Sequence, residues 1–178
     1  MLAKAYTEYY TVEDYKHWHD EWELIYGVPY AMSPSPMVTH QSINMKIARQ
    51  LSEKLDECPN CQALFEIDWE ISSDTVVKPD TLVICYEPDE KLTKKPEIIF
   101  EIASPSTIRR DETIKFELYQ QEGVAFYIIV YPENKVAKVY TLKDGRYIKS
   151  GDFSDEKHIF TTDKCKIDFD FSKIWRVR

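Results

Sequence analysis

Residues 97–103 (EIIFEIA) form a predicted strand so apolar that both of its faces must be covered. Such a strand belongs in the middle of a sheet, with further layers of structure packed on either side. Glu101 interrupts this apolar run, and burying a lone carboxylate is costly. Either the end of the strand meets water, or a cation compensates the charge of Glu101.

The remaining elements follow from hydrophobic periodicity and turn residues. Helices are predicted at 11–24, 39–55 and 108–122. Strands are predicted at 28–32, 62–71, 76–85, 97–103, 125–131 and near 158–161, with a hairpin around Lys143-Asp144-Gly145. This order predicts a single domain over residues 1–178, of the α/β (α+β) class. Its mixed central sheet is flanked by helices and carries a C-terminal β-hairpin.

Composition limits the function. The net charge of −8 argues against a nucleic-acid binder that works by neutralising phosphates alone. It allows an enzyme whose acidic site holds metal ions that meet a phosphate. No apolar run nears the roughly 20 residues of a membrane helix, and the N-terminus lacks a signal peptide. We therefore expect a cytoplasmic protein without a membrane partner.

Two carboxylates interrupt strands that should be apolar. Asp80 and Glu101 lie on consecutive predicted strands and can reach one edge of the sheet if these strands are neighbours. Two close carboxylates repel, so one takes up a proton or a cation lies between them. Mg²⁺ prefers carboxylate oxygens and water, so a magnesium site is one way to compensate Glu101.

The predicted helix at 108–122 offers a second partner. At 100° per residue, Asp111 and Lys115 fall within its apolar stripe, where a lysine needs a partner. The opposite side carries Arg109, Arg110, Thr113, Glu117 and Gln120. Glu101 is the candidate partner of Lys115. The pattern alone favours a structural reading, in which Asp80, Glu101 and Lys115 form an ion-pair network or Lys115 reaches out to water.

The four cysteines include one C-x-x-C motif, Cys58-Pro-Asn-Cys61. One such pair is half a zinc site, and no second pair follows. The motif follows a predicted helix instead of opening one, unlike a thioredoxin-type redox motif. We interpret it as a turn with two reduced thiols, with zinc and redox roles as alternatives.

Several motifs, taken in order, resemble a known bacterial family. They are WELIYGVPYAMSPSP followed by His40, VKPDTLVIC, PEIIFEIASPST, a D-x-x-x-K-x-x-x-Y pattern at Asp111, Lys115 and Tyr119, and GVAFYIIV. Together they are similar to the Uma-type restriction endonuclease-like proteins of the PD-(D/E)XK nuclease superfamily. The resemblance spans about residues 6–175. The chain departs from the family pattern at Tyr26, Phe126 and Ile128.

The resemblance implies a metal-dependent site. By it, Asp80 and Glu101 bind Mg²⁺, or Mn²⁺ in its place, and the Ile102 carbonyl is a further ligand. The superfamily's lysine usually stands two residues after the glutamate, where this chain has Ala103. Lys115 on the following helix therefore resembles a migrated catalytic lysine.

Further residues support this implied site. Glu23 matches an N-terminal acid that completes the metal site. His40 either faces the same cleft or caps a helix face, and Tyr119 places a hydroxyl near the site while Asp111 supports it.

Two functional hypotheses follow from these residues. The first is a Mg²⁺-dependent endonuclease acting on DNA, expected as a homodimer because duplex cleavage often uses two sites. The second is a non-enzymatic interaction or nucleic-acid-binding module on a nuclease fold, since fold and function separate readily.

Overall fold

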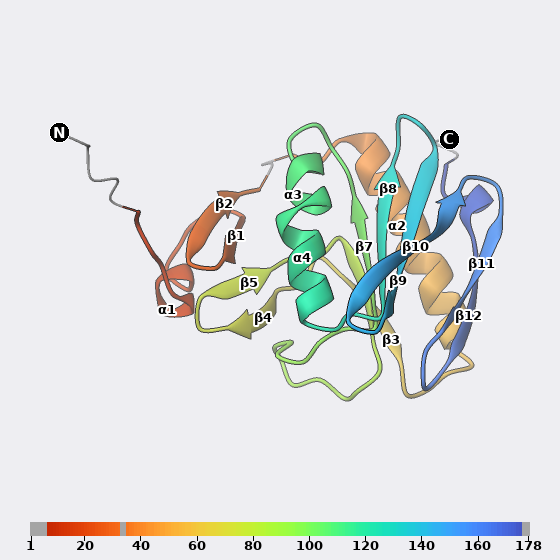
Figure 1. Ribbon diagram of the computed structural model, residues 1–178, viewed down its shortest axis with the longest axis horizontal. Helices are drawn as coiled ribbons and strands as arrows, with labels where there is room; N and C mark the ends of the chain where they lie inside the picture. The colour runs from red at the N-terminus through yellow and green to blue at the C-terminus, as the bar shows by residue number, and fades with distance from the viewer. Residues whose placement is uncertain (1–6, 33–34, 176–178) are drawn as a thin grey trace.

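A six-stranded mixed sheet forms the centre of the computed structural model, which describes residues 7–32 and 35–175 (Figure 1). Its strand order is β10-β9-β8-β7-β6-β3. The strands are β3 (Gln62–Phe65), β6 (Thr81–Ile84), β7 (Ile98–Ile102), β8 (Phe126–Tyr131), β9 (Val136–Lys143) and β10 (Arg146–Phe153). Strands β7 and β8 are parallel and the other neighbours are antiparallel, which confirms the predicted mixed sheet.

Helices cover both faces of this sheet. Helix α2 (Val38–Leu55) lies on one side, and helices α3 (Ile108–Glu112) and α4 (Ile114–Gln121) lie on the other (Figure 1). Along β7, Phe100 packs in the same cluster as α2, whereas Ile99 packs in the cluster that includes α4. The expected covering of both faces is confirmed. Because side chains alternate along a strand, Glu101 shares the α4 side with Ile99.

A second, smaller sheet lies beside the first, on the left of Figure 1. Its order is β2-β1-β5-β4, and its strands are β1 (Trp22–Ile25), β2 (Val28–Ala31), β4 (Trp69–Ser72) and β5 (Thr75–Val77). The helix predicted at 11–24 is wrong beyond its first turn, α1 (Val12–Tyr15). Leu24 and Ile25 are fully buried in β1, and this burial within a sheet prevails over the helical pattern.

Three other predicted elements are each divided in two. The strand predicted at 62–71 bends at Glu66, which has a φ of 50°, so that β3 joins the large sheet and β4 the small one. The strand predicted at 76–85 is similarly split into β5 and β6. The helix predicted at 108–122 breaks at Thr113, whose φ and ψ of −121° and −88° are not helical. Periodicity continues across the breaks at Glu66 and Thr113, which is why the pattern did not show them. The break between β5 and β6 falls at Lys78-Pro79-Asp80, where the proline was the available signal.

The C-terminal region confirms the expected hairpin and adds another. Strands β9 and β10 are joined at Asp144 and Gly145, both with positive φ, as a tight hairpin turn requires. Strands β11 (Lys157–Thr161) and β12 (Lys166–Asp170) form a separate pair, followed by the 3₁₀ helix η1 (Phe171–Lys173). Within the described ranges, no helix is both long and apolar enough to cross a membrane.

The structure contradicts the interpretation of Cys58-Pro-Asn-Cys61 as a turn with two reduced thiols. Cys58 is paired with Cys165, and Cys61 with Cys85. The partners lie 107 and 24 positions away along the chain, so the sequence alone could not place them beside the motif.

Candidate active site

Asp80 and Glu101 lie at the same end of the β6–β7 pair. Thr81 is the antiparallel partner of Phe100, and this register puts Asp80 opposite Glu101. Directly opposed antiparallel residues carry their side chains on the same face, with Cβ atoms about 5 Å apart. The backbone N–H of Ile102 donates to Asp80 Oδ2 at 2.7 Å, which fixes the aspartate against this end of β7.

Lys115 joins the two sheets. Its Nζ lies 2.7 Å from Glu23 Oε1 on β1 and 2.8 Å from Glu101 Oε1 on β7, with Asp111 Oδ1 at 3.9 Å. All four side chains are at most 5% exposed. The ion pair expected between Lys115 and Glu101 is therefore present, and Glu23 makes an equally close one.

Three further donors hold these glutamates in place. The Tyr119 hydroxyl donates to Glu101 Oε1 at 2.8 Å. The backbone N–H of Lys78 donates to Glu23 Oε1 at 3.0 Å, and Arg110 Nη1 donates to Glu23 Oε2 at 3.2 Å. These contacts on Glu101 all use Oε1. In the part of the chain that the structure describes, no side chain or backbone group donates to its Oε2.

His40 and Asn44, on the first turns of α2, hold Asp80 from the other side. His40 Nε2 lies 3.2 Å from Asp80 Oδ1. Asn44 donates to the Asp80 carbonyl at 3.2 Å and accepts from the Thr81 hydroxyl at 2.6 Å. Asp80 is thus positioned by β7 and α2. Among the described residues, His40 is the one group that contacts its Oδ1.

Burial and crowding shift the ionisation of this cluster. Burial raises the pKa of Glu101 well above its usual value, although Lys115 opposes the shift. Burial also raises the pKa of Asp111 to about 6, again against the effect of Lys115. Burial alone lowers the pKa of Lys115, but Glu101, Glu23 and Asp111 more than reverse this, so its pKa lies above the ordinary value.

The balance of charge favours an added cation. Four carboxyl groups, those of Glu23, Asp80, Glu101 and Asp111, face two permanent cations, Lys115 and Arg110. This crowding favours a proton on one carboxyl group, or a further cation beside them. Glu101 Oε2, Asp80 Oδ1 and the Ile102 carbonyl are oxygen donors of the kind that Mg²⁺ and Mn²⁺ take.

Sequence reasoning missed two residues here. Arg110 was expected on the exposed side, but its side chain is only 16% exposed and its guanidinium lies 4.8 Å from the centre of the Tyr30 ring. The break at Thr113 changes the direction of the first turn, which a continuous helical wheel cannot show. Asn44 carried a usable signal, because an amide adjoining the apolar face of α2 needs a buried partner.

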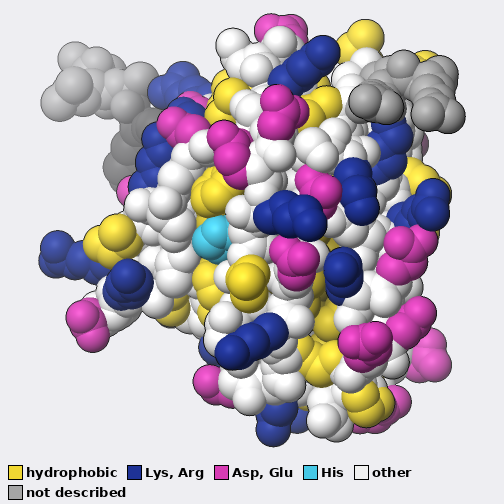
Figure 2. All heavy atoms as spheres, turned by 90° about the vertical axis from the view of Figure 1, so that its right-hand side faces the viewer, with side chains coloured by type: hydrophobic (Ala, Val, Ile, Leu, Met, Phe, Trp, Pro, Cys, Tyr) yellow, Lys and Arg dark blue, Asp and Glu magenta, His cyan; other side chains and the backbone are white. Residues whose placement is uncertain are grey.

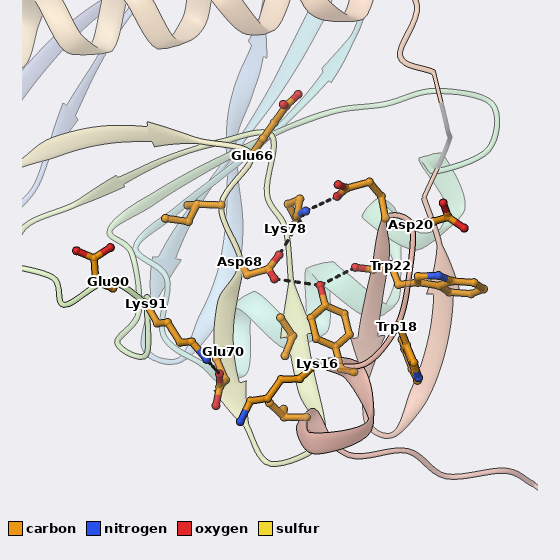
Figure 3. Close-up of a pocket in the computed structure, with 15 residues that line it drawn as sticks. Lys16, Trp18, Asp20, Trp22, Glu66, Asp68, Glu70, Lys78, Glu90 and Lys91 are labelled. Carbon is orange, nitrogen blue, oxygen red and sulfur yellow. Dashed lines mark hydrogen bonds and ion pairs between the residues drawn. The ribbon is translucent and has the colours of Figure 1, made fainter.

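A hollow of about 530 Å³ adjoins this cluster on the side of the small sheet (Figure 3). Tyr15, Trp18 and Trp22 line it, together with the side chain of Lys78, which pairs with Glu21 and lies 3.6 Å from Asp68. The buried carboxylates do not line it. Lys78 connects the two regions, because its backbone binds Glu23 while its side chain faces the hollow.

Comparisons with known proteins show the family and the fold of the chain. The model of the Uma2 family, described as "Putative restriction endonuclease", matches residues 8–161. The fold is similar to a crystal structure described as a "putative nuclease belonging to DUF820" from Anabaena variabilis ATCC 29413. That similarity has a TM-score of 0.76 and 14% identity, over 93% of this chain and 97% of that one. No curated protein matches the chain.

Proposed function

The chain belongs to the Uma2 family, and from this membership we propose that it is a metal-dependent endonuclease that hydrolyses phosphodiester bonds in DNA. One observation carries the proposal. Asp80, Glu101 and Lys115, from three separate segments, converge at one end of the β6–β7 pair. Acid, acid and lysine in this arrangement are the components that metal-assisted phosphodiester hydrolysis needs.

The donors fit a hard divalent cation. Asp80, Glu101 and the Ile102 carbonyl would hold Mg²⁺ or Mn²⁺, with Glu23 as an additional acid. When bound, such an ion supplies Lewis-acid polarisation of the phosphate and stabilises its developing charge. The surplus of carboxyl groups over permanent cations supports this assignment, because the ion would relieve the repulsion between them.

The protein's own groups have distinct tasks in this proposal. Lys115 keeps its proton at neutral pH because its pKa is raised, so it acts as a hydrogen-bond donor to water or phosphate oxygen and not as a base. Tyr119 orients Glu101, and His40 orients Asp80. Asp111 lies 3.9 Å from Lys115 Nζ and is the group toward which the ammonium can shift when substrate enters.

A non-enzymatic module on the same fold is the second candidate. The contacts of Lys115 with Glu23 and Glu101 are complete within the protein, as in a structural ion-pair network. Figure 2 also shows basic and acidic side chains interspersed on the right-hand face of Figure 1, so that face carries no broad basic surface for DNA. This candidate predicts neither cleavage nor stabilisation by Mg²⁺.

Cleavage of supercoiled plasmid and of single-stranded DNA, with Mg²⁺ or Mn²⁺, separates the two candidates. We expect nicking by the wild type and by Glu87→Gln, an exposed carboxylate that serves as the matched control. We expect no nicking by Glu101→Gln. If Glu101→Gln cleaved DNA as well as the wild type, the assignment of Glu101 to a catalytic metal site would be wrong. Light scattering on the same samples tests the expected homodimer.

A further inference from the structure

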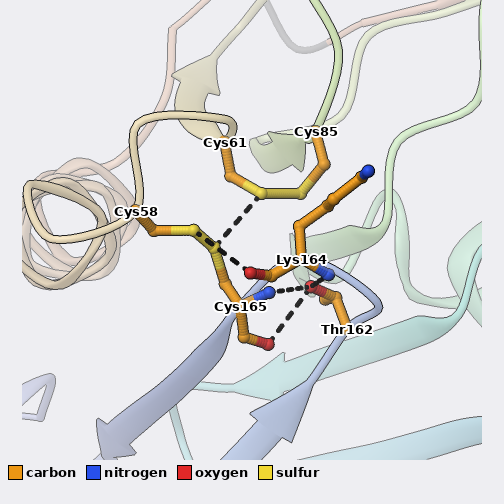
Figure 4. The surroundings of a disulfide bond; sticks show 6 residues. All are labelled: Cys58, Cys61, Cys85, Thr162, Lys164 and Cys165. Atoms are coloured by element: carbon orange, nitrogen blue, oxygen red, sulfur yellow. Dashed lines mark hydrogen bonds between the residues drawn. A yellow bond between two sulfur atoms is a disulfide. The ribbon is translucent and has the colours of Figure 1, made fainter.

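Four cysteines from distant parts of the sequence meet at one point (Figure 4). Cys58 and Cys61 lie in the turn after α2, Cys85 directly follows β6, and Cys165 lies between β11 and β12. The Cys58–Cys165 and Cys61–Cys85 pairs touch each other, because Cys165 Sγ lies 3.4 Å from Cys61 Sγ. All the cysteines of the chain therefore belong to a single sulfur cluster.

The sulfurs lie close enough together for thiolates released by reduction to share one metal ion. The sulfur atoms of Cys58, Cys61 and Cys165 all lie within 4.8 Å of one another, and Cys85 is paired with the central member, Cys61. A tetrahedral zinc with Zn–S bonds of about 2.3 Å separates its sulfurs by about 3.8 Å.

The backbone around the cluster is shaped to present the sulfurs. Cys61 N donates to the Cys58 carbonyl at 3.0 Å, which closes the C-x-x-C turn. On the opposite side, the Thr162 hydroxyl oxygen accepts from Cys165 N at 3.0 Å and from Lys164 N at 3.3 Å. The Lys164 carbonyl oxygen lies 3.7 Å from Cys58 Sγ (Figure 4). Cys61 and Cys165 are each only 8% exposed.

We propose that Cys58, Cys61, Cys85 and Cys165 bind one Zn²⁺ as four thiolates in the reduced protein. Binding releases the four thiol protons and needs no oxidant, whereas forming two disulfides removes four electrons. Four protein ligands leave no open position, so the site is structural and not catalytic. It fastens the turn after α2 and the end of β6 to the β11–β12 pair.

The test begins with the wild-type chain, purified under reducing conditions without chelator and supplied with Zn²⁺. Elemental analysis should find about one zinc per chain, released by a mercurial reagent as the four thiols react. Co²⁺ in its place should give the absorption of a tetrahedral thiolate centre. Cys165→Ser should lower the zinc content at least several-fold, whereas Met45→Ser, which removes an exposed sulfur on α2, should retain it.

Wild-type metal content decides the matter even if the cysteine variant does not fold. Absence of zinc from reduced wild type, together with no thiolate spectrum with Co²⁺, would overturn the proposal. A mass lower by four hydrogens that persists in reductant would also overturn it, because the cluster would then be two disulfides. Retention of zinc by folded Cys165→Ser would do the same.

Discussion

The ammonium of Lys115 lies 2.8 Å from the Glu101 carboxylate, and both side chains are almost completely buried. This ion pair offsets the free-energy cost of burying a glutamate in an apolar strand. Its cation comes from the helix that covers that strand. Removing one partner of a buried pair typically costs about 3–5 kcal/mol, because the other charge is left unpaired. Stability and activity must therefore be measured together at this site.

Lys115→Met should lower the free energy of unfolding by roughly 3 kcal/mol. The reason is that Glu23 and Glu101 lose their shared cation. Urea unfolding of Lys115→Met, Glu101→Gln and the double variant gives the coupling energy. We expect the double variant to be clearly more stable than the sum of the single losses predicts. Simple additivity would mean that the pair does not interact.

Asp111→Asn should remove a dependence of stability on pH. The folded pKa of Asp111, about 6, lies above its ordinary 3.8, so the folded state binds the proton more tightly than the unfolded state. This carboxyl group therefore favours the folded state below pH 4, and that contribution is lost between about pH 4 and 6. The stability of the variant relative to wild type should rise by about 3 kcal/mol across this window. An equal difference in stability between the variant and wild type at pH 4 and at pH 7 would contradict the raised pKa of Asp111.

His40→Gln should be most destabilising at low pH. Burial lowers the pKa of His40, but the hydrogen bond and the charge of Asp80 more than offset this, so the folded pKa is raised above 6.5. The resulting stabilisation is complete below the unfolded pKa and disappears as the pH rises through the folded pKa. Thermal melts of both proteins at pH 5.5 and 9 measure the difference. An equal difference at both pH values would show that the charge of His40 does not matter.

Mg²⁺ should stabilise the wild type but not Asp80→Asn. A ligand at 100 times its Kd adds about 2.7 kcal/mol, equivalent to a rise in Tm of roughly 5–10 °C for a chain of this size. Glu87→Gln should behave like the wild type. A rise of equal size in Asp80→Asn would place the binding elsewhere. No rise in any of the three proteins would favour the non-enzymatic module.

The sequence predicted the central architecture because the strongest signals were local. The apolar run at β7 required cover on both faces, and the strip containing Asp111 and Lys115 identified the inner side of the following helices. The predictions failed where a chain bends without a change in periodicity, as at Glu66 and Thr113. Neither bend leaves a mark such as proline or glycine at that position.

Contacts between distant segments were predictable only where a buried charged side chain needed a partner of opposite charge. Glu101 needed a cation, and Lys115 was the buried one available nearby. No such requirement linked Cys58 to Cys165, because a thiol can be buried among apolar side chains without a hydrogen-bonding or charged partner. Asn44 lies between these cases, since its buried amide required a partner but did not specify which one.

The position of Lys115 has a consequence for how the protein matures. With its ammonium already seated between Glu23 and Glu101, the acidic cluster can assemble on a newly made chain before any divalent ion arrives. The lysine serves as a tethered cation on Glu101 Oε1, so an ion bound later through Oε2 would share the same carboxylate with the ammonium. Because an ammonium already neutralises part of that carboxylate's charge, the proposed ion would bind more weakly and more reversibly than at an unpaired glutamate.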